Sequence, residues 1–519
     1  MKDFLGQIPA AAVVYDALRP RRPKTRYNLE QLAARLPRAV EETRPFAAGD
    51  LPGSKLVLFA TLHYWIEQAA ILGLALRGMG HDVTIAYLPF SNWEKEINQF
   101  DLRRQDRYTR RVLAPLGGLV KVVSLLDMHA DDTLPEALTN GLHTASRFDV
   151  MYSLQVEEVD EDTALYKLRM ERNRYACGVA LEYLRRGKAD AALIPNALIT
   201  ELGVFYQAAR FLETPTVTYE FNDQREQIWL AHDDIVMQQN TDGVWRARGS
   251  IPLTETEREK IHAFEKARES ATTYGKGTRR WQDAPSQGSE RLRGRLGLDS
   301  RPVVLLATNV LGDSLTLGRN IFATSMAEWI ERTVAYFVGR PDVQLVVRVH
   351  PGERLIKGPS TIRVIERAAP SMPENLHVIG PAEEINTYDV MELASLGLAY
   401  TTTVGMEMAM RGVPVIAAGK THYRDRGFAM APTSWAEYFG MLDEVLRDPA
   451  AHRLTPQQIE FAWNYGYRFF FEYPFDFPWR LMHFWKDMEE WPLARVLSDE
   501  GQAAFGRTFR YLAGERITW

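Results

Sequence analysis

Short apolar runs alternate with helical patterns along the first half of the chain. Residues 55–60 form an apolar run of strand length, and residues 67–77 follow with a helical pattern that stops at Gly78 and Gly80. A second apolar run at 81–87 completes a strand, a helix and a parallel strand. The same order returns further on, at residues 189–195 (strand), 196–211 (helix) and 214–220 (strand). The pattern predicts a parallel α/β domain. The glycine fingerprint of a dinucleotide site is absent after the first strand.

The second half repeats this alternation more regularly. The apolar runs of strand length lie at residues 303–307, 343–349, 376–379, 396–400 and 414–417. Helical patterns separate most of them, at residues 325–337, 385–395 and 404–410. Strands regularly separated by helices predict a second doubly wound α/β domain with right-handed crossovers.

The segments between and around these units set the expected domain boundaries. Residues 1–50, rich in Arg and Pro, are expected to form an irregular N-terminal arm. Residues 51–270 make the first Rossmann-like domain, with a charged helical insertion, and residues 303–455 make the second. Residues 271–302 lack periodicity and are rich in Gly, Ser, Arg and Gln, which favours a linker.

The tail at 456–519 has a helical pattern and is unusually aromatic. We expect its rings to pack against both domains, because the run Phe469–Phe471 contains no charge. Contact with a membrane surface and stacking on acceptor sugars are the less favoured alternatives.

Composition narrows the class of protein. The 519 residues are 46% hydrophobic and 25% charged, which excludes a largely disordered chain. A net charge of -5 does not suggest a nucleic-acid partner. The single cysteine, Cys177, excludes an intramolecular disulfide and a Cys-rich zinc site. No signal peptide or membrane-spanning run is recognised. We expect a cytoplasmic protein, with peripheral contact at the inner face of the membrane left open.

Candidate chemistry collects where the strands of the second domain end, which is the edge at which α/β sheets bind ligands. The turn Thr401–Gly405 leads directly into a helix, and its hydroxyls and backbone N–H groups suit a phosphate. Glu407 follows in the first turn and is a candidate acceptor for ribose hydroxyls. Alone, the threonines are better explained as helix caps. Together with His350 and Lys420 on the same edge, a ligand site is favoured.

Six segments carry a more specific signal through their order and spacing. They are Thr308-Asn-Val-Leu-Gly-Asp313, Arg348-Val-His-Pro-Gly-Glu353, Ile385-Asn-Thr-Tyr-Asp389, Tyr400-Thr-Thr-Thr-Val-Gly-Met-Glu407, Gly412-Val-Pro-Val-Ile416 and Gly419-Lys-Thr-His-Tyr-Arg424. This set resembles the C-terminal half of the capsule polysaccharide biosynthesis family of glycosyltransferases. The resemblance covers about a quarter of the chain, and the first domain is similar only in general layout.

The resemblance implies a GT-B architecture, in which two Rossmann-like domains face each other across a cleft. It implies transfer of a sugar from a nucleotide-sugar donor to a glycan or glycolipid acceptor, in capsule or surface polysaccharide synthesis, with no tightly bound cofactor. The sugar transferred, hexose or Kdo, and the nucleotide base stay open. The expected donor-binding residues are Asn309, Asp313, Arg348, His350, Pro351, Thr401, Thr402, Thr403, Gly405, Glu407, Lys420 and His422.

An inverting transfer also needs a base, which we expect from the first domain. His63 is the first candidate, because a His just after the first strand resembles the placement of the base in other inverting GT-B enzymes. A neutral imidazole also suits general-base catalysis. Glu67 and Glu220 are the second and third. No Asp-x-Asp pair stands at a strand end, so we predict no catalytic metal.

Two other functions remain open. A sugar-nucleotide 2-epimerase-like isomerase would need acids and bases around the sugar in both domains, but no acceptor groove. A non-catalytic GT-B-like protein would bind a nucleotide sugar through Thr401–Thr403 and Glu407 and would tolerate loss of His63 and Glu67.

Overall fold

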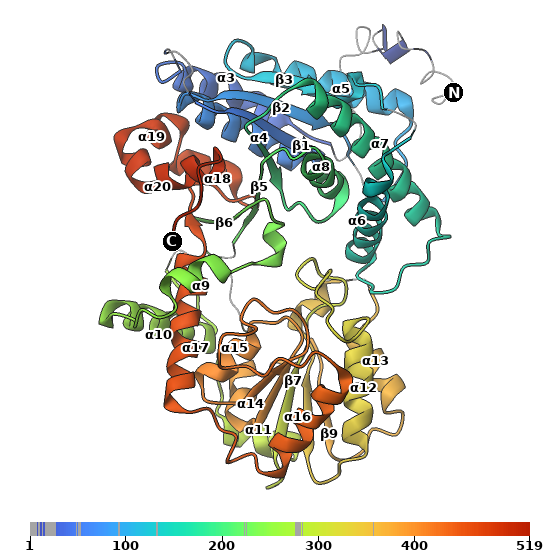
Figure 1. The fold of residues 1–519 in the computed structure, drawn as a ribbon, viewed down its shortest axis with the longest axis vertical. Coiled ribbons are helices and arrows are strands. Elements are labelled where there is room, and N and C mark those ends of the chain that lie inside the picture. The colour runs from blue at the N-terminus through green and yellow to red at the C-terminus, as the bar shows by residue number, and fades with distance from the viewer. Residues whose placement is uncertain are drawn as a thin grey trace.

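The computed structural model describes most of the chain as two α/β domains stacked along the long axis of the molecule (Figure 1). The described residues are 8, 11–12, 14–15, 27–47, 49, 53–91, 94–130, 133–222, 224, 226–275, 282, 284–356 and 358–519.

The first domain is built on a seven-stranded sheet of order β12-β6-β5-β4-β1-β2-β3. The strands are β1 (Lys55–Thr61), β2 (Asp82–Leu88), β3 (Lys121–Ser124), β4 (Ala191–Pro195), β5 (Thr216–Phe221), β6 (Gln227–His232) and β12 (Phe475–Asp476). Neighbouring strands from β3 to β5 are parallel, whereas β6 runs antiparallel to both β5 and β12. The central strand β4 is buried along its whole length, as expected for a parallel sheet covered on both faces.

Helices cover this sheet on its two faces. They are α3 (Glu30–Thr43), α4 (Leu62–Gly78), α5 (Gln99–Leu113), α6 (Glu136–Leu154), α7 (Ala164–Arg186) and α8 (Thr200–Phe211). Three further helices lie between the two sheets in sequence: α9 (Asp242–Arg248), α10 (Glu255–Glu269) and α11 (Ser289–Leu296). Helix α10 begins at a reciprocal capping box, which Thr254 and Glu257 form.

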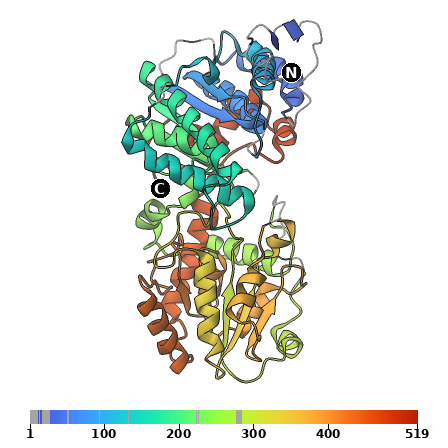
Figure 2. The same cartoon turned by 90° about the vertical axis from the view of Figure 1, so that its right-hand side faces the viewer.

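The second domain contains an all-parallel sheet of order β11-β10-β7-β8-β9. Its elements are β7 (Val303–Ala307), α12 (Met326–Val338), β8 (Gln344–Arg348), α13 (Thr361–Ala368), β9 (Leu376–Ile379), α14 (Thr387–Leu393), β10 (Leu396–Ala399), α15 (Val404–Met410), β11 (Val415–Ala417) and α16 (Trp435–Arg447). Along β7, Val303 and Leu305 pack into one core, and Val304 and Leu306 pack into another. The sheet is therefore covered on both faces, as doubly wound domains require (Figure 2).

The C-terminal tail returns from the second domain to the first (Figure 1). It contains α17 (Pro456–Tyr467), a π-helical turn (Arg468–Glu472), β12, α18 (Phe484–Glu490), α19 (Leu493–Leu497) and α20 (Asp499–Leu512). Phe469 and Phe470 belong to a core of the second domain, whereas Phe477 and Trp479 belong to the core of the first. The expected packing of the aromatic tail against both domains is confirmed, and the whole has the GT-B arrangement.

Three local predictions are wrong. Residues 30–43 of the supposed irregular arm form helix α3, whose Leu32, Leu36 and Val40 are buried in the first core at helical spacing. The helical spacing was not recognised in the sequence because Pro37, a residue that is unusual inside helices, lies within α3. A strand, β3, interrupts the stretch expected to be helical, and α11 lies inside the expected linker with only Leu292 buried. The remainder of the arm lies largely outside the described residues.

Candidate functional site

Two neighbouring cavities lie between the domains. The larger, of about 680 Å³, is lined mostly by the first domain. The smaller, of about 170 Å³, is lined mostly by the second domain and by the returning tail. Trp229 and Leu315 line both cavities, so the two meet at this pair of side chains.

The larger cavity lies at the carboxyl ends of β1, β4 and β5, the edge at which open α/β sheets bind ligands. His63 and Glu67 reach it from the start of α4, Asn196 from the end of β4, and Glu220 from the end of β5. The structure therefore brings all three predicted base candidates into one cavity.

Three residues that line this cavity have a strained backbone. These residues are Leu62, Asn196 and Thr200, with φ values of 59°, 59° and 56°. Such values lie in the left-handed region, which residues other than glycine adopt uncommonly. Each such conformation costs about 1–3 kcal/mol and persists only where surrounding contacts enforce it. Clustered strain of this kind is typical of functional sites.

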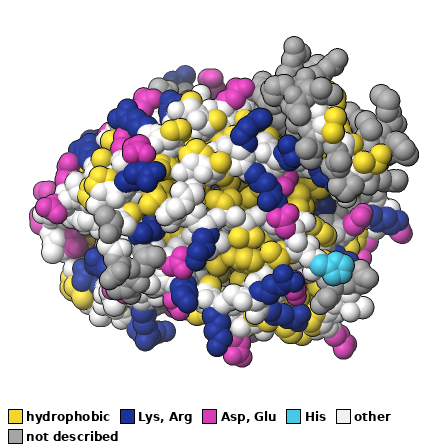
Figure 3. Space-filling model, turned by 90° about the horizontal axis from the view of Figure 1, so that it is seen from above, with side chains coloured by type: hydrophobic (Ala, Val, Ile, Leu, Met, Phe, Trp, Pro, Cys, Tyr) yellow, Lys and Arg dark blue, Asp and Glu magenta, His cyan; other side chains and the backbone are white. Residues whose placement is uncertain are grey.

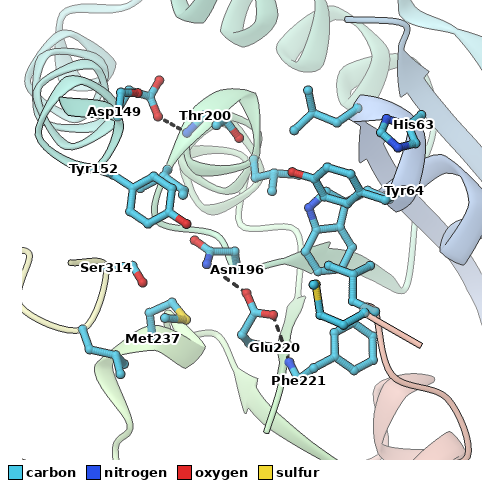
Figure 4. A pocket seen from close by; sticks show the side chains of 18 of the residues that line it. His63, Tyr64, Asp149, Tyr152, Asn196, Thr200, Glu220, Phe221, Met237 and Ser314 are labelled. Atoms are coloured by element: carbon cyan, nitrogen blue, oxygen red, sulfur yellow. Dashed lines mark hydrogen bonds between the residues drawn. The ribbon is translucent and has the colours of Figure 1, made fainter. Parts of the chain in front are cut away.

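Glu220 lies on the side of the cavity that faces the second domain, near Met237 and Ser314 (Figure 4). Its Oε2 accepts a hydrogen bond from Asn196 Nδ2 at 2.9 Å, and its Oε1 accepts one from the backbone N–H of Phe221 at 2.9 Å. In the β5–β6 pairing Glu220 is opposite Trp229, so it stands where the two cavities meet. Burial raises the pKa of this carboxyl.

His63 lies on the other side of the larger cavity from Glu220 (Figure 4), and Glu67 lines the same cavity. The His63 ring is half-buried against Tyr64, and burial lowers its pKa, so the imidazole is neutral at neutral pH. Glu67 is 9% exposed and accepts a hydrogen bond from Trp485 Nε1 at 3.3 Å. Burial raises the pKa of Glu67 to about 7.

Replacing Glu67 by Gln is expected to stabilise the protein at alkaline pH. Because its pKa is raised on folding from 4.5, the wild type loses stability as pH rises from about 4.5 to about 7. Glu67→Gln removes this loss, so it should be more stable than the wild type by about 3 kcal/mol at pH 8 and about equal to it at pH 4.5. Urea unfolding at both pH values measures the difference. Glu259→Gln, an exposed residue of α10, serves as control. An equal difference at both pH values would contradict the prediction.

A buried ionic cluster forms the floor of the larger cavity. Arg169 of α7 lies between Asp149 of α6 and Glu201 of α8, with Nη2–oxygen distances of 3.0 and 2.9 Å. Asp149 also accepts hydrogen bonds from the Thr200 N–H and from Asn173 Nδ2. Sequence analysis missed this cluster, because its members lie on helices and not at strand ends.

The smaller cavity gathers half of the predicted donor-binding residues. Asn309 and Asp313 follow β7, His350 follows β8, and Thr401, Thr402 and Thr403 follow β10. Phe469 and Phe470 of the tail complete the lining together with Asn222, Gln224 and Gln239 of the first domain. These five residues could not be predicted from the sequence, because they come from the first domain and the tail and not from the strand ends of the second domain.

Hydrogen bonds hold this polar lining in place. Asn309 Oδ1 accepts from the Thr401 N–H at 3.2 Å, which joins the ends of β7 and β10. His350 Nδ1 accepts from the Gly352 N–H at 2.9 Å, so the neutral ring carries its proton on Nε2. The Thr401 hydroxyl is buried and has no hydrogen-bond partner among the described residues, which leaves a donor for a ligand.

The other predicted donor-binding residues line neither cavity. Arg348 donates to the carbonyls of Gly380 and Ile385, at 2.8 and 3.3 Å, and Pro351 begins a short 3-10 helix. Gly405 lies so close to the Tyr423 hydroxyl that a Cβ would collide with it.

Glu407, His422 and Lys420 are likewise placed away from the cavities. Glu407 is buried and bonds Arg268 and the Tyr388 hydroxyl, at 2.5 and 2.7 Å. The His422 ring is buried and stacks on the Phe469 ring, with the two ring centroids 3.8 Å apart. The side chain of Lys420 is exposed.

The described residues contain no group of three or more His, Cys, Asp or Glu placed to hold a metal ion. Within the same residues, no helix is long and apolar enough to cross a membrane.

The outer end of the first domain carries apolar side chains in a hollow with Lys and Arg around it (Figure 3).

Comparison with protein families finds no matching family, and comparison with curated proteins finds no match. Among solved structures, the chain is similar to KpsC, a beta Kdo 2,4 transferase of Thermosulfurimonas dismutans, with 17% identity over 53% of this chain and 79% of that one and a TM-score of 0.33. It is also similar to a putative UDP-N-acetylglucosamine 2-epimerase from Listeria monocytogenes, with 14% identity over 80% of this chain and 94% of that one and a TM-score of 0.27. The UDP-GlcNAc 2-epimerase from Neisseria meningitidis, bound to UDP-GlcNAc, has 11% identity over 81% of this chain and 99% of that one and a TM-score of 0.27. Likenesses this weak assign no activity.

Proposed function

We propose that this protein is a glycosyltransferase that moves a sugar from a nucleotide-sugar donor to a hydroxyl of a glycan or glycolipid acceptor. The observation that carries the proposal is the junction of the two cavities. A small polar cavity with hydroxyl, amide and imidazole groups shares two lining residues, Trp229 and Leu315, with a larger cavity that contains ionisable groups. In this proposal the donor occupies the smaller cavity and the acceptor the larger one.

The chemistry at the junction follows from the groups that meet there. The acceptor oxygen forms the new bond to the anomeric carbon, while the bond from that carbon to the donor phosphate breaks. Glu220, in its carboxylate form, takes the proton of the acceptor hydroxyl. The Thr401–Thr403 turn and His350 Nε2 donate hydrogen bonds to the departing phosphate, on which negative charge develops. Asn196 and the Phe221 N–H hold the Glu220 carboxylate in position.

We place Glu220 ahead of His63 as the base. Glu220 is opposite Trp229 at the junction, whereas His63 lines the far side of the larger cavity (Figure 4). Glu67 accepts a hydrogen bond from Trp485, and we assign it no role in catalysis.

The volume of the larger cavity favours transfer over epimerisation. An isomerase acts on a single nucleotide sugar and needs no second substrate site. A space of about 680 Å³ beside the smaller cavity provides one. Synthesis of capsule or other surface polysaccharide completes the proposal, together with contact between an anionic membrane and the Lys and Arg side chains at the outer end of the first domain.

Replacing both Thr402 and Thr403 by Ala is expected to weaken nucleotide binding about tenfold. Each hydroxyl contributes about 0.5–1.5 kcal/mol through a hydrogen bond to the donor phosphate, and tenfold equals about 1.4 kcal/mol. Thermal shifts with CMP, UDP, GDP, ADP and dTDP first identify the nucleotide, since a ligand of the folded state raises stability. The shift should persist in the control Thr273→Ala, an exposed residue of another segment. An undiminished shift in the double variant would remove this turn from the donor site.

The function itself is tested by incubating the protein with labelled nucleotide sugars and with glycan or glycolipid acceptors. Label that appears in the acceptor supports the proposal. An epimerised nucleotide sugar would support the isomerase instead, and nucleotide binding without turnover would support a non-catalytic binding protein.

A further inference from the structure

Three arginines are among the largest fully buried side chains of the described residues: Arg169, Arg319 and Arg468. Burying a guanidinium costs several kcal/mol unless an opposite charge compensates for it. Arg169 lies between Asp149 and Glu201, and Arg468 forms ion pairs with Glu257 and Glu472. Arg319 differs from both, because it has no carboxylate within 4.0 Å in the part of the chain that the structure describes.

The partners of Arg319 are neutral oxygens from both domains. Its Nη1 donates to the carbonyl of Lys420 at 3.0 Å. Its Nη2 donates to the carbonyl of Met237 at 2.5 Å and to Gln239 Oε1 at 3.4 Å. Its Nε is buried and has no hydrogen-bond partner in the described part of the chain. Burial lowers the pKa of this guanidinium to about 10, so it remains charged at neutral pH.

This unbalanced charge lies beside the smaller cavity. Gln239, which accepts from Arg319, lines that cavity. Asp313 also lines the smaller cavity. Its negative charge raises the pKa of Arg319 through space, although the two side chains form no ion pair. The Asp313 carboxylate is itself held by the Leu315 N–H at 3.0 Å. The cavity wall therefore has a positive charge behind it that one distant carboxylate balances only in part.

We propose that Arg319 is a positioning residue whose buried charge is balanced by the phosphate group of the nucleotide in the smaller cavity. This inference rests on the proposed function, because it names the anionic part of the proposed donor. Since Arg319 bonds both Met237 of the first domain and Lys420 of the second, the bound phosphate also stabilises the contact between the domains.

The test compares Arg319→Gln with the wild type, with inorganic diphosphate as the probe at constant ionic strength. Calorimetric titration should show diphosphate binding at least tenfold weaker in Arg319→Gln. Arg319→Lys, which keeps the charge, should bind within about fivefold of the wild type. The nucleoside of the best nucleotide, which lacks phosphate, should bind Arg319→Gln and the wild type equally.

Arg468→Gln is the matched control, because Arg468 is equally buried but already balanced by carboxylates. It should lose stability yet bind diphosphate like the wild type. Equal diphosphate binding by Arg319→Gln and the wild type, or equal losses for diphosphate and nucleoside, would overturn the inference and leave the proposed function standing. A wild type that binds neither diphosphate nor any nucleotide would overturn both. If Arg319→Gln does not fold, Arg319→Lys decides, and a loss well beyond fivefold counts against the inference.

Discussion

Glu220→Gln is expected to lower kcat about 10²–10⁴-fold, which is the usual contribution of a general base. The amide keeps the shape of the side chain but cannot take a proton from the acceptor. Donor affinity should stay near the wild-type value, because Glu220 lines the larger cavity and not the smaller one. Steady-state transfer rates together with nucleotide titration separate the two effects.

The pH dependence of kcat gives an independent check. Because burial raises the pKa of Glu220, wild-type kcat should rise with pH over a range above the 4.5 that is usual for Glu. The small residual activity of Glu220→Gln should lack this rise. His63→Ala is the comparison, since His63 has a pKa below its usual 6.5 and lies on the other side of the cavity. Near-normal kcat in Glu220→Gln together with a large loss in His63→Ala would transfer the base to His63.

Arg169→Ala is expected to lower the free energy of unfolding by about 3–5 kcal/mol, the usual cost of breaking a buried ion pair from one side. The substitution leaves Asp149 and Glu201 buried together without their shared cation. It also loosens the junction of α6, α7 and α8, on which the floor of the larger cavity depends. Denaturant unfolding of the whole chain measures the loss.

Arg147→Ala is the matched control for this prediction. Arg147 forms an ion pair with Glu161 in which both side chains are over 40% exposed, so its removal should cost about 1 kcal/mol or less. Similar losses in Arg147→Ala and Arg169→Ala would show that burial of the cluster contributes little.

Much of the second domain was predictable from sequence because its strands are buried on both faces. Such strands form uninterrupted apolar runs, and β7, which is buried along its whole length, occupies the predicted residues 303–307. The parallel topology then places the strand ends along one edge. This is why Asn309 and His350 lie near the Thr401–Thr403 turn, as strand-end reasoning expected.

Side-chain partnerships between distant parts of the chain were not predictable in this way. Glu407 has the local pattern of a ligand-binding residue, yet Arg268, 139 positions earlier, binds its carboxylate. His422 likewise follows a strand end, but the tail covers it with Phe469. Helix and strand periodicity records which face of an element is buried and does not record which residue of another element it meets.

The returning tail has a consequence for synthesis on the ribosome. Strand β12 covers the edge of β6, and Phe477, Trp479 and Phe509 fill the core beneath the first sheet. An uncovered strand edge and an incomplete core invite pairing with other chains. The first domain, although translated first, stays in this state until residues 475–513 have left the exit tunnel. The N-terminal half of the nascent chain is therefore the half that depends longest on protection by chaperones.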